Sequence, residues 1–242
     1  MSRLGSEEYP RIAELAGAVS FGRVYPSAVV LGRQSGEIYE DKNALLIWHR
    51  CGFAWLPGDC DEGFLGEVSR LKSQFSRRMV LFTHDPRVTE YFEDRGAQVG
   101  SRLFFEHRHI PPRGIIPEGY EVCEMGAELF GKLSGQVVPT QFWDDAEQFC
   151  RFGKGFCITK NGDPAAWAFS ASCDGEEVDI GIMTAEAHRG QGLAYAAAEL
   201  MLRAVISDGR RPVWACISEN KGSRRIAEKL GFEVAGECRI IK

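Results

Sequence analysis

Two glycines at a strand-to-helix junction mark the segment of this chain best suited to binding a charged ligand. The segment comprises Arg189, Gly190, Gln191, Gly192, Leu193 and Ala194. Residues 178–183 before it read as a strand, and residues 193–206 read as a helix rich in Ala and Leu. Glycines permit a tight turn and a close approach to a ligand, and the helix presents unpaired N–H groups and the positive end of its dipole. This combination predicts a phosphate or pyrophosphate site.

Two familiar phosphate-binding patterns fit the turn poorly. A P-loop needs Gly-Lys-Ser/Thr, and no Lys follows these glycines. A dinucleotide fingerprint needs a third Gly or Ala where Tyr195 stands, and its first Gly comes directly off the strand. Here residues 184–189 intervene, although Glu219 stands where a ribose-binding acid is expected. Neither pattern therefore accounts for the turn.

The arrangement Arg-x-x-Gly-x-Ala after a strand resembles instead the acyl-CoA turn of the GNAT acetyltransferase superfamily. The resemblance continues downstream, where residues 212–217 read as the next strand and are followed by Asn220, Ser223 and the segment Ile226–Phe232. A divergent first half, the region of Trp143 and the Glu-Val-Asp-Ile strand narrow the likeness to the group that includes the zwittermicin-resistance acetyltransferases. The resemblance implies an N-acetyltransferase that uses acetyl-CoA as its cosubstrate.

A proline-rich segment, residues 110–117, separates two halves, because its prolines and glycine interrupt helix and sheet. After it, strands are expected at 120–125, 156–160 and 165–172, and helices at 127–134 and 140–149. This order matches a GNAT core. We therefore expect an α/β (α+β) fold with the whole GNAT core in residues 118–242 and a degenerate GNAT-like lobe in residues 1–117.

The first half also has an α/β pattern, and the sequence of residues 92–99 is weakly similar to that of residues 227–234. Where its phosphate turn should fall, however, the chain carries Asp59, Asp61 and Glu62. Three carboxylates would repel a pyrophosphate. The first lobe is therefore expected to leave CoA unbound and to shape the acceptor pocket.

The resemblance also implies roles for residues of the second half. Backbone groups of the strand before the turn would hold the pantetheine arm; these are Ile182, Met183 and Thr184. The turn itself would hold the pyrophosphate. Asn220 and Ser223 would contact the CoA arm, with helix N-capping as the alternative for Asn220.

Acyl transfer to an amine needs a base, because an amine with a pKa near 10 is protonated at neutral pH. The strand at 178–183 and the residues before it offer Glu176, Glu177 and Asp179. Glu177 and Asp179 share one face of the strand. Asp179 is favoured because Val178 and Ile180 flank it, so burial should raise its pKa. Glu177 is the alternative base. The simpler interpretation of both residues is that they are solvated acids without a chemical role.

Two departures from the family pattern concern the acid and the end of the sheet. Many GNAT enzymes have a Tyr where this chain has Ala227, so the group that protonates the thiolate is open among Ser218, Ser223, Tyr195 and no protein group. Only ten residues follow Phe232, so the last strand is expected to be short, missing or supplied from elsewhere. These departures keep a second function in view, a non-catalytic acyl-CoA-binding or sensing module.

Composition limits the remaining classes. The 242 residues are 44% hydrophobic and carry a net charge of −5, with most of the acidic excess in the second half, which argues against nucleic acid and favours a small cationic amine as partner. No apolar run approaches a membrane span, and no signal-peptide core is recognisable, so a cytoplasmic protein is expected. The 8 cysteines form no C-x-x-C pair, and no metal-ligand spacing occurs, so neither disulfides nor a metal is expected. The oligomeric state is left open, with a homodimer as one possibility.

Overall fold

A single sheet of twelve strands runs through the whole chain in the computed structural model, which describes residues 1–242, and its strand order is β1-β2-β3-β4-β5-β12-β6-β11-β10-β9-β8-β7. The strands from the first half are β1 (Ser2–Arg3), β2 (Gly36–Asp41), β3 (Ala44–His49), β4 (Phe53–Trp55), β5 (Val80–Thr83) and β6 (Val99–His107). Those from the second half are β7 (Glu121–Glu124), β8 (Gly155–Lys160), β9 (Asp163–Cys173), β10 (Glu177–Thr184), β11 (Arg211–Ile217) and β12 (Phe232–Ile241). The mixed α/β class expected from the sequence is confirmed.

Eight α-helices cover the sheet. They are α1 (Ala13–Gly17), α2 (Val24–Val30), α3 (Glu62–Gln74), α4 (Pro86–Glu93), α5 (Ala127–Lys132), α6 (Ala146–Phe152), α7 (Leu193–Ser207) and α8 (Lys221–Lys229). Short 3-10 helices lie at Ser6–Ile12 (η1), Pro139–Gln141 (η2) and Glu186–His188 (η3). The helix expected over 140–149 was wrong at its start, because Asp145 caps α6 by accepting a hydrogen bond from the Gln148 amide at 2.8 Å.

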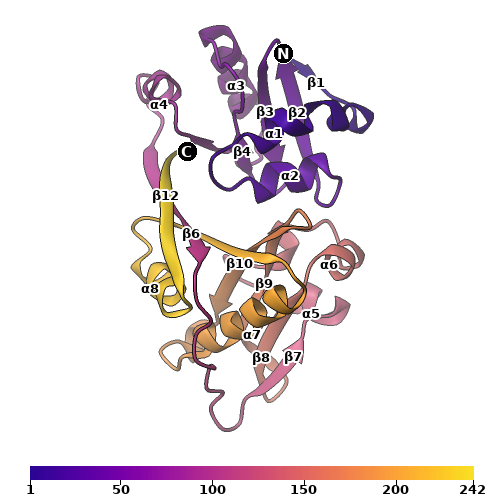
Figure 1. The fold of residues 1–242 in the computed structure, drawn as a ribbon, viewed down its shortest axis with the longest axis vertical. Helices are drawn as coiled ribbons and strands as arrows, with labels where there is room; N and C mark the ends of the chain where they lie inside the picture. Colours follow the sequence, from indigo (N-terminus) through magenta and orange to yellow (C-terminus); the bar gives the residue numbers. More distant parts are fainter.

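The two lobes exchange strands at their junction. Strand β6, from the first half, lies between β11 and β12, with Phe104 opposite Ala215 on one side and Gly236 on the other. Strand β12 then extends beyond its own lobe and pairs with β5, so that Arg239 lies opposite Thr83. Figure 1 shows β6 and β12 side by side at the junction of the lobes; β6 runs towards the lower lobe, and β12 runs towards the upper one, where the C-terminus ends near α4.

This exchange answers the question of the missing last strand. The strand between β11 and β12 is supplied from elsewhere, namely by β6, and β12 itself is neither short nor missing. The expectation that residues 118–242 carry the whole core was therefore wrong in this one strand. A division of the chain at residues 117 and 118 stays a prediction, since the sheet is continuous across it.

The hydrophobic core is shared between the lobes. Its largest cluster joins Tyr25 and Phe53 of the first half to Phe169 and Trp214 of the second, and α7 adds a buried stripe of alanines with Met201. Small residues on α7 allow the helix to lie close to β8, β9 and β10, with which it is in contact. The largest cluster is therefore continuous across the junction of the lobes.

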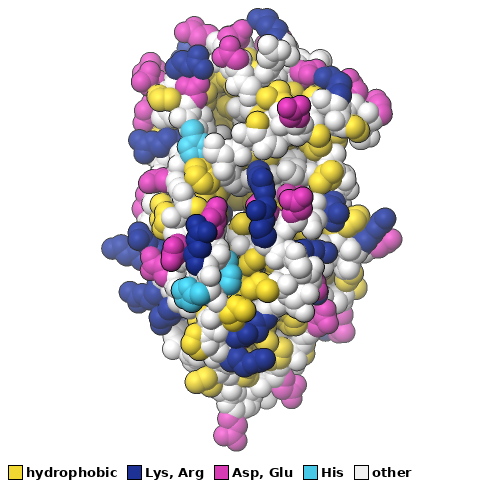
Figure 2. All heavy atoms as spheres, in the orientation of Figure 1, with side chains coloured by type: hydrophobic (Ala, Val, Ile, Leu, Met, Phe, Trp, Pro, Cys, Tyr) yellow, Lys and Arg dark blue, Asp and Glu magenta, His cyan; other side chains and the backbone are white.

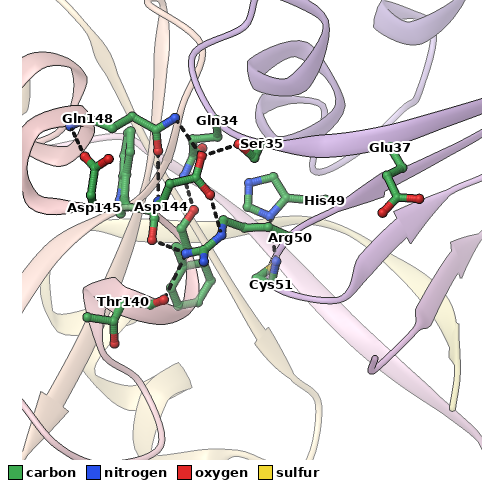
Figure 3. A network of polar contacts seen from close by, with 12 residues as sticks. Gln34, Ser35, Glu37, His49, Arg50, Cys51, Thr140, Asp144, Asp145 and Gln148 are labelled. Carbon is green, nitrogen blue, oxygen red and sulfur yellow. Dashed lines mark hydrogen bonds and ion pairs between the residues drawn. The ribbon is translucent and has the colours of Figure 1, made fainter. Parts of the chain in front are cut away.

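A polar network that is only partly buried also joins the lobes (Figure 3). The Arg50 side chain pairs with Asp144 at 2.9 Å and donates to the Thr140 carbonyl at 2.9 Å. Gln34, close by, donates from Nε2 to the Ala171 carbonyl at 3.0 Å. Because both side chains satisfy backbone groups of the other lobe, they fix the orientation of one lobe against its neighbour.

Candidate active site

The glycine turn lies at the start of α7, as expected. Gly190 and Gly192 have φ of 80° and 79°, and an added Cβ would meet nothing within 4 Å at either position, so backbone conformation rather than space requires glycine. Gly192 is the N-cap of α7, and no side chain caps the helix. The first N–H groups of α7 are consequently free for an anion.

Two cationic side chains that were not predicted as site residues also face this turn. A cavity of about 220 Å³ is lined by the turn, by Thr184 and by Arg225 and Lys229 of α8. Neither cation has an ion-pair partner, whereas Arg224 on the same helix pairs with Glu228 at 2.8 Å. Their i, i+4 spacing was the available signal, because it puts both on one face of a helix. The turn and α8 together form a basic, anion-sized hollow.

Strand β10 separates from β11 part-way along its length. Their parallel pairing ends where Asp179 lies opposite Val213, and a register irregularity on the β9 side follows between Asp179 and Ile180. Beyond this point the edge of β10 that faces β11 has no strand partner, so backbone groups there are available to a ligand. The partly exposed residues on this open stretch include Ile182, Met183 and Thr184.

Asp179 lies where the two strands separate and lines a cavity of about 250 Å³ between the lobes. It is 4% exposed, and its Oδ2 accepts a hydrogen bond from the Tyr25 hydroxyl at 2.6 Å, while Oδ1 is buried without a partner. Burial raises the pKa of this carboxyl, against the smaller lowering effects of the Arg102 charge and the Tyr25 hydrogen bond. A carboxylate with a raised pKa and a free oxygen can accept a proton from an amine.

Tyr25, the residue that donates to Asp179, was not predicted from the sequence. It is the second residue of α2 in the first half, 154 residues from Asp179, and no local pattern connects the two. The ring is buried and stacks on Trp55 with centroids 5.4 Å apart. Tyr25 therefore orients Asp179 from the opposite lobe.

Glu177 is differently placed at the rim of the same cavity. Its Oε1 is 3.0 Å from Arg23 Nη2 and 2.9 Å from Arg211 Nη2. On the face drawn in Figure 2, Lys and Arg side chains cross the middle of the molecule with acidic ones beside them. Because both of its neighbours neutralise it, Glu177 is a weaker candidate for the base than Asp179.

Asn220 and Ser223 are both engaged inside the protein. The Asn220 side chain caps α8 by accepting a hydrogen bond from the Ser223 amide at 3.0 Å, which is the capping alternative. Ser223 Oγ accepts a hydrogen bond from Trp214 Nε1 at 3.1 Å. Contacts of these two residues with CoA stay predictions.

The candidates for the thiolate acid are engaged as well. Tyr195 donates to the Pro112 carbonyl at 2.7 Å. Ser218 shares a short hydrogen bond with Ser101. None of these hydroxyls lines the cavity that holds Asp179.

The first lobe's counterpart of the glycine turn is closed. The Asp61 side chain caps α3 by accepting a hydrogen bond from the Phe64 amide at 2.8 Å. Its carboxylate thus takes the position that a bound anion would occupy at this helix N-terminus. A Cβ at Gly58 would come within 1.9 Å of the Asn43 carbonyl oxygen, so the loop is packed against the backbone of the β2–β3 turn. These contacts agree with a first lobe that leaves CoA unbound, which stays a prediction.

A model of GNAT acetyltransferases matches residues 27–241. The chain belongs to the GNAT acetyltransferase family. It is 30% identical over 220 residues to the uncharacterized N-acetyltransferase YdfB of Bacillus subtilis (strain 168), covering 85% of this chain and 84% of that protein. The expected acyltransferase activity is thus confirmed at the level of the family.

Solved structures confirm the fold. A GCN5-related N-acetyltransferase-like protein from Streptococcus suis 89/1591 has a TM-score of 0.80 at 22% identity, over 98% of both chains. A tandem GNAT protein from the clavulanic acid biosynthesis pathway has a TM-score of 0.69 at 15% identity, over 99% of this chain and 96% of that one. The second match agrees with two GNAT-like lobes in one chain.

No cluster of three or more His, Cys, Asp or Glu side chains is arranged to hold a metal ion, and all 8 cysteines are free. No helix has the length and apolar character needed to cross a membrane.

Proposed function

We propose that this protein transfers the acetyl group of acetyl-CoA to a primary amine of a small molecule. The observation that carries the proposal is Asp179, a buried carboxyl with one free oxygen that faces a cavity where β10 leaves β11. A donor thioester lying along the open edge of β10 would reach this point from one side, and an amine in the cavity would reach it from the other.

In the proposed reaction Asp179 takes a proton from the bound ammonium group. The nitrogen lone pair then attacks the acetyl carbonyl carbon, the new N–C bond forms, the C–S bond breaks and CoA leaves as its thiolate, while the nitrogen loses its second proton to solvent water. Backbone N–H groups of the open stretch of β10 would stabilise the oxyanion, as preorganised donors do. No protein acid is assigned to the thiolate, whose modest pKa permits it to leave unprotonated.

CoA binding is proposed for the second lobe alone. The pyrophosphate would lie against the N–H groups of residues 190–194, with Arg189, Arg225 and Lys229 providing positive charge. The pantetheine arm would run along Ile182–Thr184. The first lobe offers no equivalent, since its turn is capped by Asp61 and closed by Asn43.

Release of the CoA thiol tests the proposal directly. The protein is mixed with acetyl-CoA and a panel of primary amines, and free thiol is followed with a chromogenic reagent. Each amine is paired with its N,N-dimethyl counterpart, which cannot form a neutral amide. Thiol release is expected with primary amines only. Calorimetric binding of acetyl-CoA without amine-dependent release across the panel would contradict the transfer step.

A further inference from the structure

The cavity beside Asp179 contains a guanidinium that forms no ion pair with an acid of the chain. Arg102, on the exchanged strand β6, is half-buried, donates from Nη2 to the Ala215 carbonyl at 3.0 Å, and has no carboxylate within 4.0 Å. The other two arginines in the lining, Arg23 and Arg211, both pair with Glu177.

The other two acids of the lining, Glu106 and Asp179, form no ion pair with Arg102, although its charge lowers the pKa of Asp179. Glu106 pairs with Arg108 at 2.8 Å. Desolvating a guanidinium without a counter-ion is costly, and its planar donors match a carboxylate in a bidentate geometry. The N–H groups of Arg102 that Ala215 leaves free thus form a site for an anion from outside the chain.

Aromatic side chains make up much of the rest of the lining. Trp55 and Phe82 stack with centroids 4.6 Å apart, and the Arg102 guanidinium lies 5.0 Å from the centroid of Phe53. The cavity volume of about 250 Å³ is below the roughly 300–1,000 Å³ of drug-sized sites. Its occupant should be small, with a compact aromatic or branched apolar part.

We propose that the acceptor is an amino acid with an aromatic or large aliphatic side chain. Its amine meets Asp179, its carboxylate binds Arg102, and its side chain lies on the aromatic wall formed by Trp55 and Phe82. This rests on the proposed function, because the amine is the nucleophile there. The amine nitrogen bonds to the acetyl carbon, the C–S bond breaks, and the products are the N-acetylamino acid and CoA, with the amine's proton passed to Asp179.

Two compounds that differ only in the carboxylate test the proposal. L-Phenylalanine and 2-phenylethylamine are compared by kcat/KM for thiol release from acetyl-CoA, and by quenching of tryptophan fluorescence without acetyl-CoA, because Trp55 lines the cavity. Phenylalanine should be preferred by about 10–100-fold in both measurements, the usual effect of a charge-assisted hydrogen bond. Equal values for the two compounds in the unaltered protein would overturn the proposal.

Variants assign the preference to its residue. Arg102→Gln should abolish the preference, and Arg102→Lys should retain part of it. Arg78→Gln is the matched control, since Arg78 lies 5.4 Å from the same Phe53 ring but does not line the cavity; its preference should be unchanged. A preference that survives Arg102→Gln would also overturn the assignment.

Thiol release and tryptophan fluorescence together distinguish a failure of this inference from a failure of the proposed function on which it rests. Thiol release with both compounds, but without a preference, would contradict the amino-acid acceptor and leave acetyl transfer standing. Fluorescence that shows an Arg102-dependent preference for phenylalanine, with no thiol release, would support the amino-acid site and contradict the transfer reaction.

Discussion

At the scale of single residues, the candidate chemistry rests on one buried carboxylate and the groups that adjust it. Asp179 is almost fully buried, and Oδ1 has no partner. An unpaired polar atom in a protein interior is unfavourable unless a ligand uses it. This orphaned oxygen therefore marks the site more sharply than the acidity of the strand does.

Replacing Asp179 by Asn preserves the shape of the side chain and removes its basicity. The turnover of an acetylated amine should fall by about 10²–10⁴-fold, the usual contribution of a general base. The affinity for acetyl-CoA, measured by calorimetry on the same preparation, should stay unchanged because Asp179 lies on the acceptor side. Glu177→Gln is the control on the same strand face. If Glu177→Gln loses turnover and Asp179→Asn retains it, the base is Glu177.

Tyr25 should act on the pH profile through its hydrogen bond to Asp179. This bond lowers the pKa of Asp179, so Tyr25→Phe should raise it further above the ordinary value of 3.8. Since the base works only when deprotonated, the acidic limb of kcat/KM should move to higher pH, and acetyl-CoA affinity should not change. Tyr39→Phe is the control, because the Tyr39 hydroxyl donates to Glu37, outside the cavity. An unmoved limb in Tyr25→Phe, with normal folding, would limit Tyr25 to a packing role.

At the scale of elements, the turn between β10 and α7 combines two requirements in one residue. Gly192 must adopt a left-handed conformation and must leave the helix N-terminus open to an anion. Substitutions can separate these requirements, because Asn tolerates positive φ better than most residues and Asp has nearly the same shape with a negative charge.

Gly192→Asp should abolish acetyl-CoA binding in calorimetry, whereas Gly192→Asn should retain binding with at most a modest loss. The difference arises because only the carboxylate repels the pyrophosphate. Thermal unfolding of both variants shows whether the backbone is equally strained. Undiminished binding in Gly192→Asp would rule out this turn as the pyrophosphate site.

At the scale of the whole molecule, the exchanged strands make each lobe dependent on the other. β6 brings Arg102 into the second lobe's sheet, and β12 adds a neighbour to β5 in the first. Tyr25 reaches Asp179 across the same junction. The acceptor cavity consequently exists only when both lobes are assembled, whereas the CoA turn belongs to one.

A fragment of residues 119–242 should fail to fold into a stable monomer, because removing β6 exposes the facing edges of β11 and β12. A fragment of residues 97–242 keeps β6 and is the matched control. Size-exclusion chromatography and thermal melting by circular dichroism should show aggregation for the shorter fragment and a cooperative transition for the longer one. A cooperative, monomeric 119–242 fragment would contradict this dependence.

The sequence by itself determined the parts of the site that are contiguous in the chain. The strand at 178–183, the helix at 193–206 and the glycines between them were predicted within a residue or two, because periodicity and positive φ at glycine are local properties. The choice of Asp179 over its neighbours also came from its two apolar flanks, and the structure buries it.

Only the tertiary structure decided which distant residues meet. Three features join segments that lie more than one hundred residues apart. They are the position of β6 between β11 and β12, the hydrogen bond from Tyr25 to Asp179, and the placement of the unpaired Arg102 guanidinium against the Ala215 carbonyl. Strand pairing and side-chain contact of this kind depend on how the lobes pack, and one face of a strand looks the same in sequence whichever strand becomes its neighbour. For that reason the turn proposed to bind pyrophosphate was visible in the sequence, while the cavity proposed to bind the acceptor was not.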